Sequence, residues 1–313
     1  MSDNSAPTAT DPQATKATKR TKKQPKPAAQ APLPSSPAYP EWLSDEVDLF
    51  DFDCNLTHPD FEGQAPELIT SAQSARVTQM LVPGATLEES QACVALCRQH
   101  PKALFPTAGV HPYNATMPFD PTAFATLSEL AAAPDVVAVG ECGLDFSPGF
   151  PSPELQLAWF VPQLELACAL QKPLFLHERL AHAPFLEALT GRSLPPAVVH
   201  CFTGTAAEAR VYVALGFYIG ITGFICKPHG AELQALLRDG AVPLDRLVVE
   251  TDAPYMGFPR CRQLEPTHPK RQSPNVPTAL PRVVEALAAC LDLPVREVAA
   301  ATTYNARKFL RLL

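Results

Sequence analysis

The protein has 313 residues, of which 46% are hydrophobic, and a formal net charge of −7. This length fits one large domain or two ordinary ones, and the negative charge argues against a protein that binds nucleic acid through charge alone. Nine cysteines, an odd number without CxxC spacing, favour free thiols over a disulfide framework or a zinc ribbon. No apolar run reaches the roughly 18 residues of a membrane span. Because the N-terminus also has no signal-like apolar core, we expect a cytoplasmic protein.

Residues 1–42 differ in composition from the rest of the chain. The first 40 residues carry eight prolines and a basic cluster that includes Lys22, Lys23 and Lys26. Such a segment has too little apolar surface to offset the entropy that ordering would cost. We therefore predict a disordered Pro/Ala/Lys-rich tail over 1–42 and one folded domain over 43–313. The lysines could contact nucleic acid, although a solvated tail without a defined role is the simpler interpretation.

Short apolar segments alternate with segments of helical spacing from Glu46 to the C-terminus. Apolar runs rich in β-branched residues predict eight strands, at 47–53, 76–82, 103–109, 135–141, 173–178, 197–202, 217–222 and 246–252. Apolar residues three and four positions apart predict eight helices, at 87–100, 121–133, 153–171, 182–190, 205–215, 229–238, 277–291 and 295–311. Short, wholly apolar strands between helices indicate βαβ units and a buried parallel sheet.

Eight strand–helix units in roughly 270 residues predict an α/β fold of the TIM (β/α)8 barrel class. A doubly wound sheet is the alternative. No strand is followed by GxGxxG or GxxxxGK[ST], which weakens the nucleotide-binding forms of that second fold.

Polar residues stand at the ends of four predicted strands. Glu141 follows the fourth strand, His177 the fifth, His200 the sixth and Asp252 the eighth. One such residue alone would more often be a core histidine, a helix cap or a salt-bridge partner. Four of them, at strand ends that meet on one face of a barrel, predict a site for a divalent ion. Glutamate, histidine and aspartate suit Mg, Mn or Zn.

Five sequence motifs of the chain resemble those of the TatD family of metal-dependent deoxyribonucleases. GVHP, VGECGLDF, HCFTGT, YIGITGFIC and VETDAPY occur in this order, and the resemblance runs from about Leu49 to the C-terminus. It implies a barrel of the amidohydrolase type that hydrolyses phosphodiester bonds, typically as a 3′→5′ exonuclease. It also implies that Glu141, His177, His200 and Asp252 bind one or two divalent metal ions.

The end of the first strand departs from the family pattern. Many members carry H-x-H there, whereas this chain has Asp53 and Asn55 in FDFDCNLTH. We predict that Asp53 is a metal ligand and that the site is oxygen-rich, with Mg or Mn most suitable and Zn as the alternative. Asp51 is predicted to support the ligands through structural hydrogen bonds.

The resemblance also suggests roles around the metal. Asp252 is predicted to be the general base and Glu141 to bridge two ions, which makes both catalytic. Further residues are predicted to contact a single-stranded DNA or RNA substrate. They are His111, Asp145, Arg179, His182 and Lys270.

Several of these contacts have alternatives. His111 could instead stabilise its loop, Asp145 could orient a metal ligand, and Arg179 could pair with Glu178 or Asp145. Lys270 lies in a loop after the eighth strand that could also be an ordinary charged loop, and the family's RNEP stands here as PNVP.

Two other functions compete with the nuclease. One is a metal-dependent hydrolase of a small ester, amide or phosphoester on the same barrel, because barrels change their chemistry through their loops. The other is a barrel that has lost activity and serves as a scaffold. The sequence leaves the oligomeric state open, with a monomer favoured.

Overall fold

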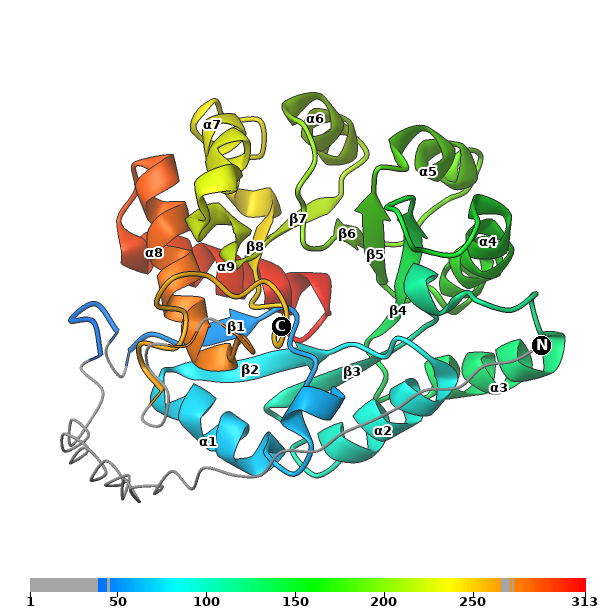
Figure 1. The fold of residues 1–313 in the computed structure, drawn as a ribbon, viewed down its shortest axis with the longest axis horizontal. Coiled ribbons are helices and arrows are strands. Elements are labelled where there is room, and N and C mark those ends of the chain that lie inside the picture. Colours follow the sequence, from blue (N-terminus) through cyan, green and yellow to red (C-terminus); the bar gives the residue numbers. More distant parts are fainter. Residues whose placement is uncertain (1–38, 44–45, 266–270, 272) are drawn as a thin grey trace, which may run out of the picture. The chain divides into compact units, whose positions relative to one another are not determined.

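The computed structural model describes residues 39–43, 46–265, 271 and 273–313. In this part eight parallel strands form one sheet in the order β1 to β8, and Figure 1 shows them as a ring with helices around it. The strands are β1 (Leu49–Asp51), β2 (Val77–Val82), β3 (Leu104–Ala108), β4 (Ala138–Asp145), β5 (Leu174–Arg179), β6 (Ala197–Val199), β7 (Tyr218–Ile221) and β8 (Leu247–Val249).

Backbone contacts between β1 and β8 close the ring. The amide of Phe52 donates to the carbonyl oxygen of Val249 at 3.0 Å, and Cys54 pairs with Ala253 in a parallel bridge. A doubly wound sheet would have two open edges at these strands. The predicted TIM barrel is therefore confirmed and the alternative is wrong.

Nine α-helices lie in the described residues, one more than predicted. They are α1 (Ala65–Ser74), α2 (Leu87–Cys97), α3 (Pro121–Ala132), α4 (Pro153–Leu170), α5 (His182–Leu189), α6 (Ala206–Ala214), α7 (Ala231–Arg238), α8 (Leu280–Leu291) and α9 (Val295–Phe309). The helix that the sequence did not predict is α1. It buries only Leu68, Ile69 and Ala72, so its apolar stripe is short. None of the helices in the described ranges is long and apolar enough to cross a bilayer.

Aromatic side chains fill the barrel near the N-terminal ends of the strands. Phe50 and Phe52 of the first strand segment pack with Phe175 and Tyr218, and Phe309 of α9 lies against Phe52 with ring centroids 5.4 Å apart. Helix α9 sits beside the N-terminal ends of the strands, where the Thr303 hydroxyl donates to the carbonyl of Asp48 at 3.0 Å. This end is plugged by apolar rings, so the polar site can form only at the opposite end.

Lys172, which follows α4, holds the segment between α3 and β4 by donating hydrogen bonds to three carbonyl oxygens. Its Nζ donates to the carbonyl oxygens of Ala131 and Ala133 at 2.6 Å and of Val136 at 2.7 Å. Lys172→Met would leave these acceptors without that donor, so we expect the free energy of unfolding to fall by about 1–3 kcal/mol. Urea denaturation measures the change, with the exposed Lys102→Met as the matched control. Equal midpoints for the two variants would contradict this structural role.

The predicted tail lies mostly outside the described residues, which begin at residue 39. Close to the predicted boundary, the indole of Trp42 donates to Glu285 of α8 at 2.9 Å.

Candidate metal centre

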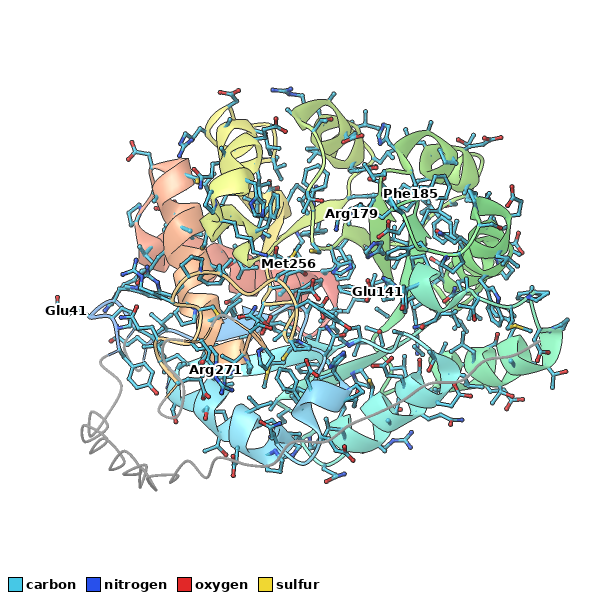
Figure 2. The ribbon with its side chains drawn as sticks, in the orientation of Figure 1. Glu41, Glu141, Arg179, Phe185, Met256 and Arg271 are labelled. Carbon is cyan, nitrogen blue, oxygen red and sulfur yellow. The ribbon has the colours of Figure 1, made fainter. Side chains whose placement is uncertain are left out.

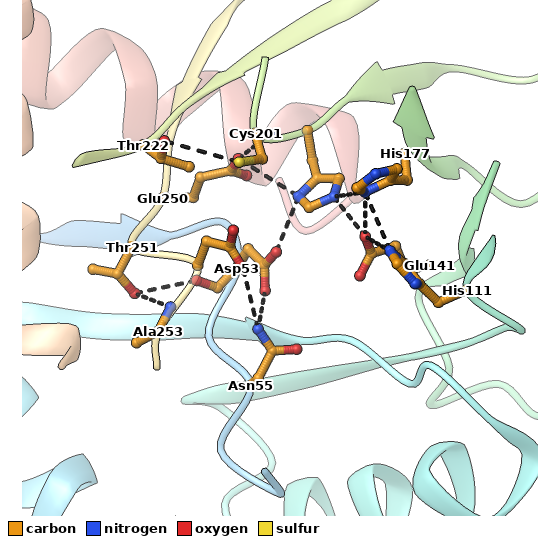
Figure 3. Close-up of polar contacts among 12 residues, drawn as sticks. Asp53, Asn55, His111, Glu141, His177, Cys201, Thr222, Glu250, Thr251 and Ala253 are labelled. Atoms are coloured by element: carbon orange, nitrogen blue, oxygen red, sulfur yellow. Dashed lines mark hydrogen bonds and ion pairs between the residues drawn. The ribbon is translucent and has the colours of Figure 1, made fainter. Parts of the chain in front are cut away.

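Three imidazole nitrogens converge on one carboxylate oxygen at the C-terminal end of the barrel. Oε1 of Glu141 lies 2.6 Å from Nε2 of His200, 3.0 Å from Nδ1 of His177 and 3.2 Å from Nε2 of His111. Figure 3 shows the contacts around Glu141, and Figure 2 marks its position in the whole barrel. Among the described residues, two groups of ligand atoms lie close enough to hold a metal ion. We call them cluster A (Asp53, Glu141, His200) and cluster B (His111, Glu141, His177).

The sequence GECGLD brings β4 unusually close to β5. Gly143 has φ +152°, and a Cβ on it would lie 1.8 Å from the carbonyl oxygen of His177. No side chain fits between these backbones, so glycine is required for the pairing. The close pairing places Glu141 and His177 on neighbouring strands with their side chains in contact. Strand β4 also continues to Asp145, four residues beyond the predicted end at 141.

The donor atoms of the site fit a divalent cation. Nδ1 of His177 lies 3.2 Å from Nε2 of both His111 and His200. Two ring nitrogens at this distance need one N–H and one lone pair, so lone pairs point into the cluster. In addition, Oδ2 of Asp53 and Nδ1 of His200 form a buried ion pair at 3.0 Å, and neither atom has a further hydrogen-bond partner among the described residues. Buried polar atoms of this kind are costly unless they bind something, and imidazole with carboxylate suits a divalent metal.

The charges of the site compensate one another inside a buried environment. Burial alone would raise the pKa of Glu141, but His200 and His111 hold it well below its usual range. Burial alone would lower the pKa of His200, yet Glu141 and Asp53 raise it well above its usual value. The pKa of Asp53 is raised by burial and by the nearby Asp252. A metal ion bound here would displace protons from the histidines, since imidazole ligates in its neutral form.

Asp51 and Asn55 support the first strand end. Asp51 accepts hydrogen bonds from the amide and the hydroxyl of Thr251, at 2.7 and 2.6 Å, as the predicted structural role requires. Burial raises the pKa of Asp51 to about 8. The amide nitrogen of Asn55 lies 3.4 Å from Oδ1 of both Asp53 and Asp252. Asn55 therefore joins the two carboxylates rather than adding an imidazole to the site.

Asp252 lies beside the two clusters but contributes no atom to either of them. Its side chain is half-buried, whereas Asp53 is fully buried. Burial and the charge of Glu141 raise the pKa of Asp252 to about 6. Its predicted roles as metal ligand and general base remain predictions, and the partial exposure favours contact with water or substrate.

Glu250 is a further carboxylate of the site, to which the sequence analysis gave no role. It is fully buried, its Oε1 accepts from the amide of Cys201, and it lies 3.7 Å from Nδ1 of His200. Its Oε2 has no hydrogen-bond partner among the described atoms. Burial raises the pKa of Glu250 to about 7. The signal was available, because Glu250 directly follows the apolar strand β8, at the end of the strand where the other site residues stand.

His111 and Asp145 both contact the metal centre directly. Nδ1 of His111 accepts from the amide of Tyr113 at 3.0 Å, which stabilises the loop, while Nε2 completes cluster B. His111 was predicted to contact substrate and not to be a ligand. Asp145 is buried, and its Oδ2 lies 3.0 Å from Nε2 of His177 while Oδ1 accepts from the amide of Ser147. This geometry matches the alternative in which Asp145 orients a ligand.

The other predicted substrate residues lie on the β5–α5 segment or outside the described part. Arg179 is exposed and makes no ion pair with any described residue, so neither suggested salt bridge forms. Nδ1 of His182 lies 2.8 Å from the hydroxyl of Tyr212, which donates to Glu178 at 2.7 Å. Lys270 lies outside the described residues. Lys227 is a further cation, not predicted from the sequence, and its Nζ lies 4.0 Å from the sulfur of Met256.

Comparison with known proteins identifies the family. The model of the family described as TatD related DNase matches residues 50–311. This chain belongs to that family. It is 43% identical over 267 residues to the 3′-5′ ssDNA/RNA exonuclease TatD of Erwinia tasmaniensis, covering 84% of this chain and all of the relative. It is 45% identical to the protein of the same name from Cronobacter turicensis, covering 84% and 98% of the two chains.

Solved structures of TatD proteins share the fold. The crystal structure of YJJV, a TatD homolog from Escherichia coli K12, has a TM-score of 0.75 at 29% identity and covers 83% of this chain and 97% of its own. A TatD family hydrolase from Entamoeba histolytica has a TM-score of 0.73 at 20% identity, covering 84% and 98%. The resemblance proposed from GECGLD, HCFTGT and ETDAPY is thus confirmed.

Proposed function

We propose that this TatD family protein is a divalent-metal-dependent nuclease that removes nucleotides from the 3′ end of single-stranded DNA or RNA. The observation that carries the proposal is the convergence of three imidazole nitrogens on Glu141, beside Asp53, at the C-terminal mouth of the barrel. Relatives at 43% and 45% identity over most of the chain bear the name of such an exonuclease.

Clusters A and B would hold the metal, with Glu141 shared between them. A bound divalent cation supplies a water of lowered pKa and neutralises charge on the phosphate oxygens. Asp145 fixes the ring of His177 through Nε2, so that Nδ1 faces Glu141. An orienting carboxylate of this kind sets the tautomer of a ligating histidine and increases its basicity.

Asp252 would take the proton from the attacking water. It is the half-exposed carboxylate of the group, and Asn55 holds its Oδ1 from one side at 3.4 Å. An ionised carboxylate at this position can accept a proton from a water within hydrogen-bond reach.

Cations at the mouth would hold the substrate phosphates. Arg179 is exposed and unpaired within the described ranges, and its planar guanidinium can contact two phosphate oxygens at once. Lys227 likewise makes no ion pair with a described carboxylate. Such local cations would compensate for the overall charge of −7, which disfavours long-range attraction of a polyanion.

The finer points of the proposal concern the metal, the compartment and the assembly. Asp53 adds a carboxylate oxygen to cluster A where many family members have a histidine, which favours Mg or Mn over Zn. All nine cysteines are free, which supports a reducing, cytoplasmic location. The predicted monomer can be checked by light scattering of the full chain.

The test is degradation of single-stranded DNA and RNA that carry a label at either end. With Mg or Mn we expect labelled mononucleotide to appear first from the 3′-labelled strand, and EDTA to abolish its release because the ligands then lack their ion. The Glu141→Ala variant, purified in parallel, controls for contaminating nucleases. If neither polymer is cleaved with either metal while small esters or phosphoesters are, the protein is a hydrolase of another class.

A further inference from the structure

Two pairs of aromatic side chains stand at the mouth of the barrel with much of their surface exposed. Tyr113 is 58% exposed and packs edge-on against Phe150, with ring centroids 5.3 Å apart. Tyr255 is 54% exposed and packs in the same way against His58 at 5.2 Å. Tyrosine combines a flat apolar ring with a polar hydroxyl and is enriched at binding surfaces.

Each pair is attached directly to the metal centre. The amide of Tyr113 donates to Nδ1 of His111 at 3.0 Å, and the ring of Phe150 lies 6.4 Å from that of His111. The amide of Tyr255 donates to the carbonyl oxygen of Asp252 at 2.7 Å. One pair therefore borders the His111 side of the site and the other borders the Asp252 side.

The strand order separates the two pairs around the mouth. Tyr113 and Phe150 follow β3 and β4, whereas His58 and Tyr255 follow β1 and β8. Strands β1 and β8 are neighbours at the closure of the ring, and β2 stands between β1 and β3. Asp53 follows β1 and Glu141 lies on β4, so each pair shares a strand with a residue of cluster A. A single-stranded nucleic acid bound across cluster A would therefore contact one aromatic pair on each side of the phosphodiester bond to be cleaved.

Both tyrosines are held firmly at one edge. The hydroxyl of Tyr255 lies 2.9 Å from Nε2 of His58, whose Nδ1 accepts from the amide of Asp60 at 3.1 Å. Tyr113 is the middle residue of a short helical turn (Pro112–Asn114) that His111 caps. Rings fixed in this way lose little entropy when a flat partner covers their open side.

We propose that these two pairs are stacking platforms for nucleobases on either side of the scissile phosphate. The inference rests on the proposed nuclease function and adds how the substrate is recognised: by unpaired bases, irrespective of their identity. Stacking on aromatic rings tolerates every base, because each has a π-face. It also requires a single strand, since bases inside a duplex have no free face. It gives an acidic protein a way to bind a polyanion that does not depend on its net charge.

The experiment measures binding of single-stranded oligonucleotides by the full chain. The 3′-terminal linkages are phosphorothioates, which resist hydrolysis, and 2-aminopurine or an abasic residue replaces one base at a time near the 3′ end. We expect the native protein to quench 2-aminopurine at the stacked positions and to bind the abasic strands about tenfold more weakly. Tyr113→Leu and Tyr255→Leu should each raise Kd about tenfold for the complete strand and less than twofold for the matching abasic strand. Tyr113→Phe should restore binding, because the ring is kept. Tyr255→Phe should restore it in part, because the ring is kept but its hydrogen bond to His58 is lost.

Tyr304→Leu is the matched control, since Tyr304 is 52% exposed but lies on α9 at the opposite end of the barrel. Leucine variants that bind as the native protein does, or that weaken the abasic strands equally, would overturn the stacking platforms. If a leucine variant unfolds, the binding of abasic strands by the native protein is the remaining test. Equal affinity of the native protein for the abasic and the complete strands would then refute the stacking platforms. If the native protein hydrolyses ordinary linkages and the leucine variants bind with an unchanged Kd, the proposed nuclease function stands and the stacking platforms are refuted. If the bases stack on the tyrosines but ordinary linkages are not hydrolysed, the proposed nuclease function is refuted instead.

Discussion

Glu141→Gln is expected to lower kcat/KM on single-stranded DNA by at least about 10³-fold, the equivalent of about 4 kcal/mol in transition-state stabilisation. Glu141 is the only residue that clusters A and B share within the described chain, and three histidine nitrogens face its Oε1. Glutamine has nearly the same shape but carries no charge, so it neutralises no cation and offers one poor oxygen ligand. We expect both clusters to lose metal affinity together.

The measurement combines turnover with metal content. Release of the 3′ label gives kcat/KM, and elemental analysis of the protein after equilibration with Mn gives the bound metal. Glu129→Gln, an exposed glutamate on α3, is the matched control and should behave as the native protein does. A Glu141→Gln variant that keeps both its metal and its activity would show that the convergence at Oε1 is a structural network rather than a metal centre.

The fold could be predicted because its signals are local. Each strand is a short apolar run and most helices repeat apolar residues at three and four positions, so the barrel followed from eight such units. Helix α1 was missed although Leu68, Ile69 and Ala72 give it a buried face, because no side-chain cap precedes it at Gln64 to mark its start. Strand β4 was predicted too short because GECGLD contains glycine and charge. Those residues extend the strand only because β5 approaches so closely at Gly143.

The site could be predicted only in part, because some of its contacts depend on tertiary approach. Glu141, His177 and His200 stand at strand ends, and the structure brings them together as expected. The place of His111 in cluster B depends on how its loop folds back, which no spacing in the sequence encodes. Glu250 was overlooked although it stands near the end of a predicted strand, because a fully buried charge is unexpected without a partner.

The replacement of H-x-H after the first strand changes the contacts between the site residues, but the site itself is kept. Where H-x-H would supply two imidazoles, Asp53 contacts His200 and Asn55 connects Asp53 with Asp252. The carboxylate of Asp53 keeps a charged oxygen in cluster A. The amide of Asn55 separates two carboxylates that would otherwise repel each other. This arrangement links the buried ligands to the half-exposed Asp252.

Asp252→Asn is therefore expected to separate catalysis from metal binding. Because Asp252 contributes no atom to cluster A or cluster B, both clusters should keep their metal while the proposed proton acceptor is lost. We expect kcat on single-stranded DNA to fall by about 10³-fold, within the range of general base catalysis, with KM changed less than threefold. Asparagine keeps the size of the side chain, although its amide can no longer accept a proton from water.

Single-turnover rates with 3′-labelled DNA, together with the Mn content of the same preparation, give both quantities for Asp252→Asn. Asp245→Asn, an exposed aspartate before β8, is the matched control and should leave both unchanged. If Asp252→Asn loses its metal along with its activity, Asp252 is a ligand, and the base must be sought at another carboxylate such as Glu250. If the metal stays and the rate does not fall, the proton passes to a group outside this set. Only the loss of rate with retained metal supports the assignment of Asp252 as the base.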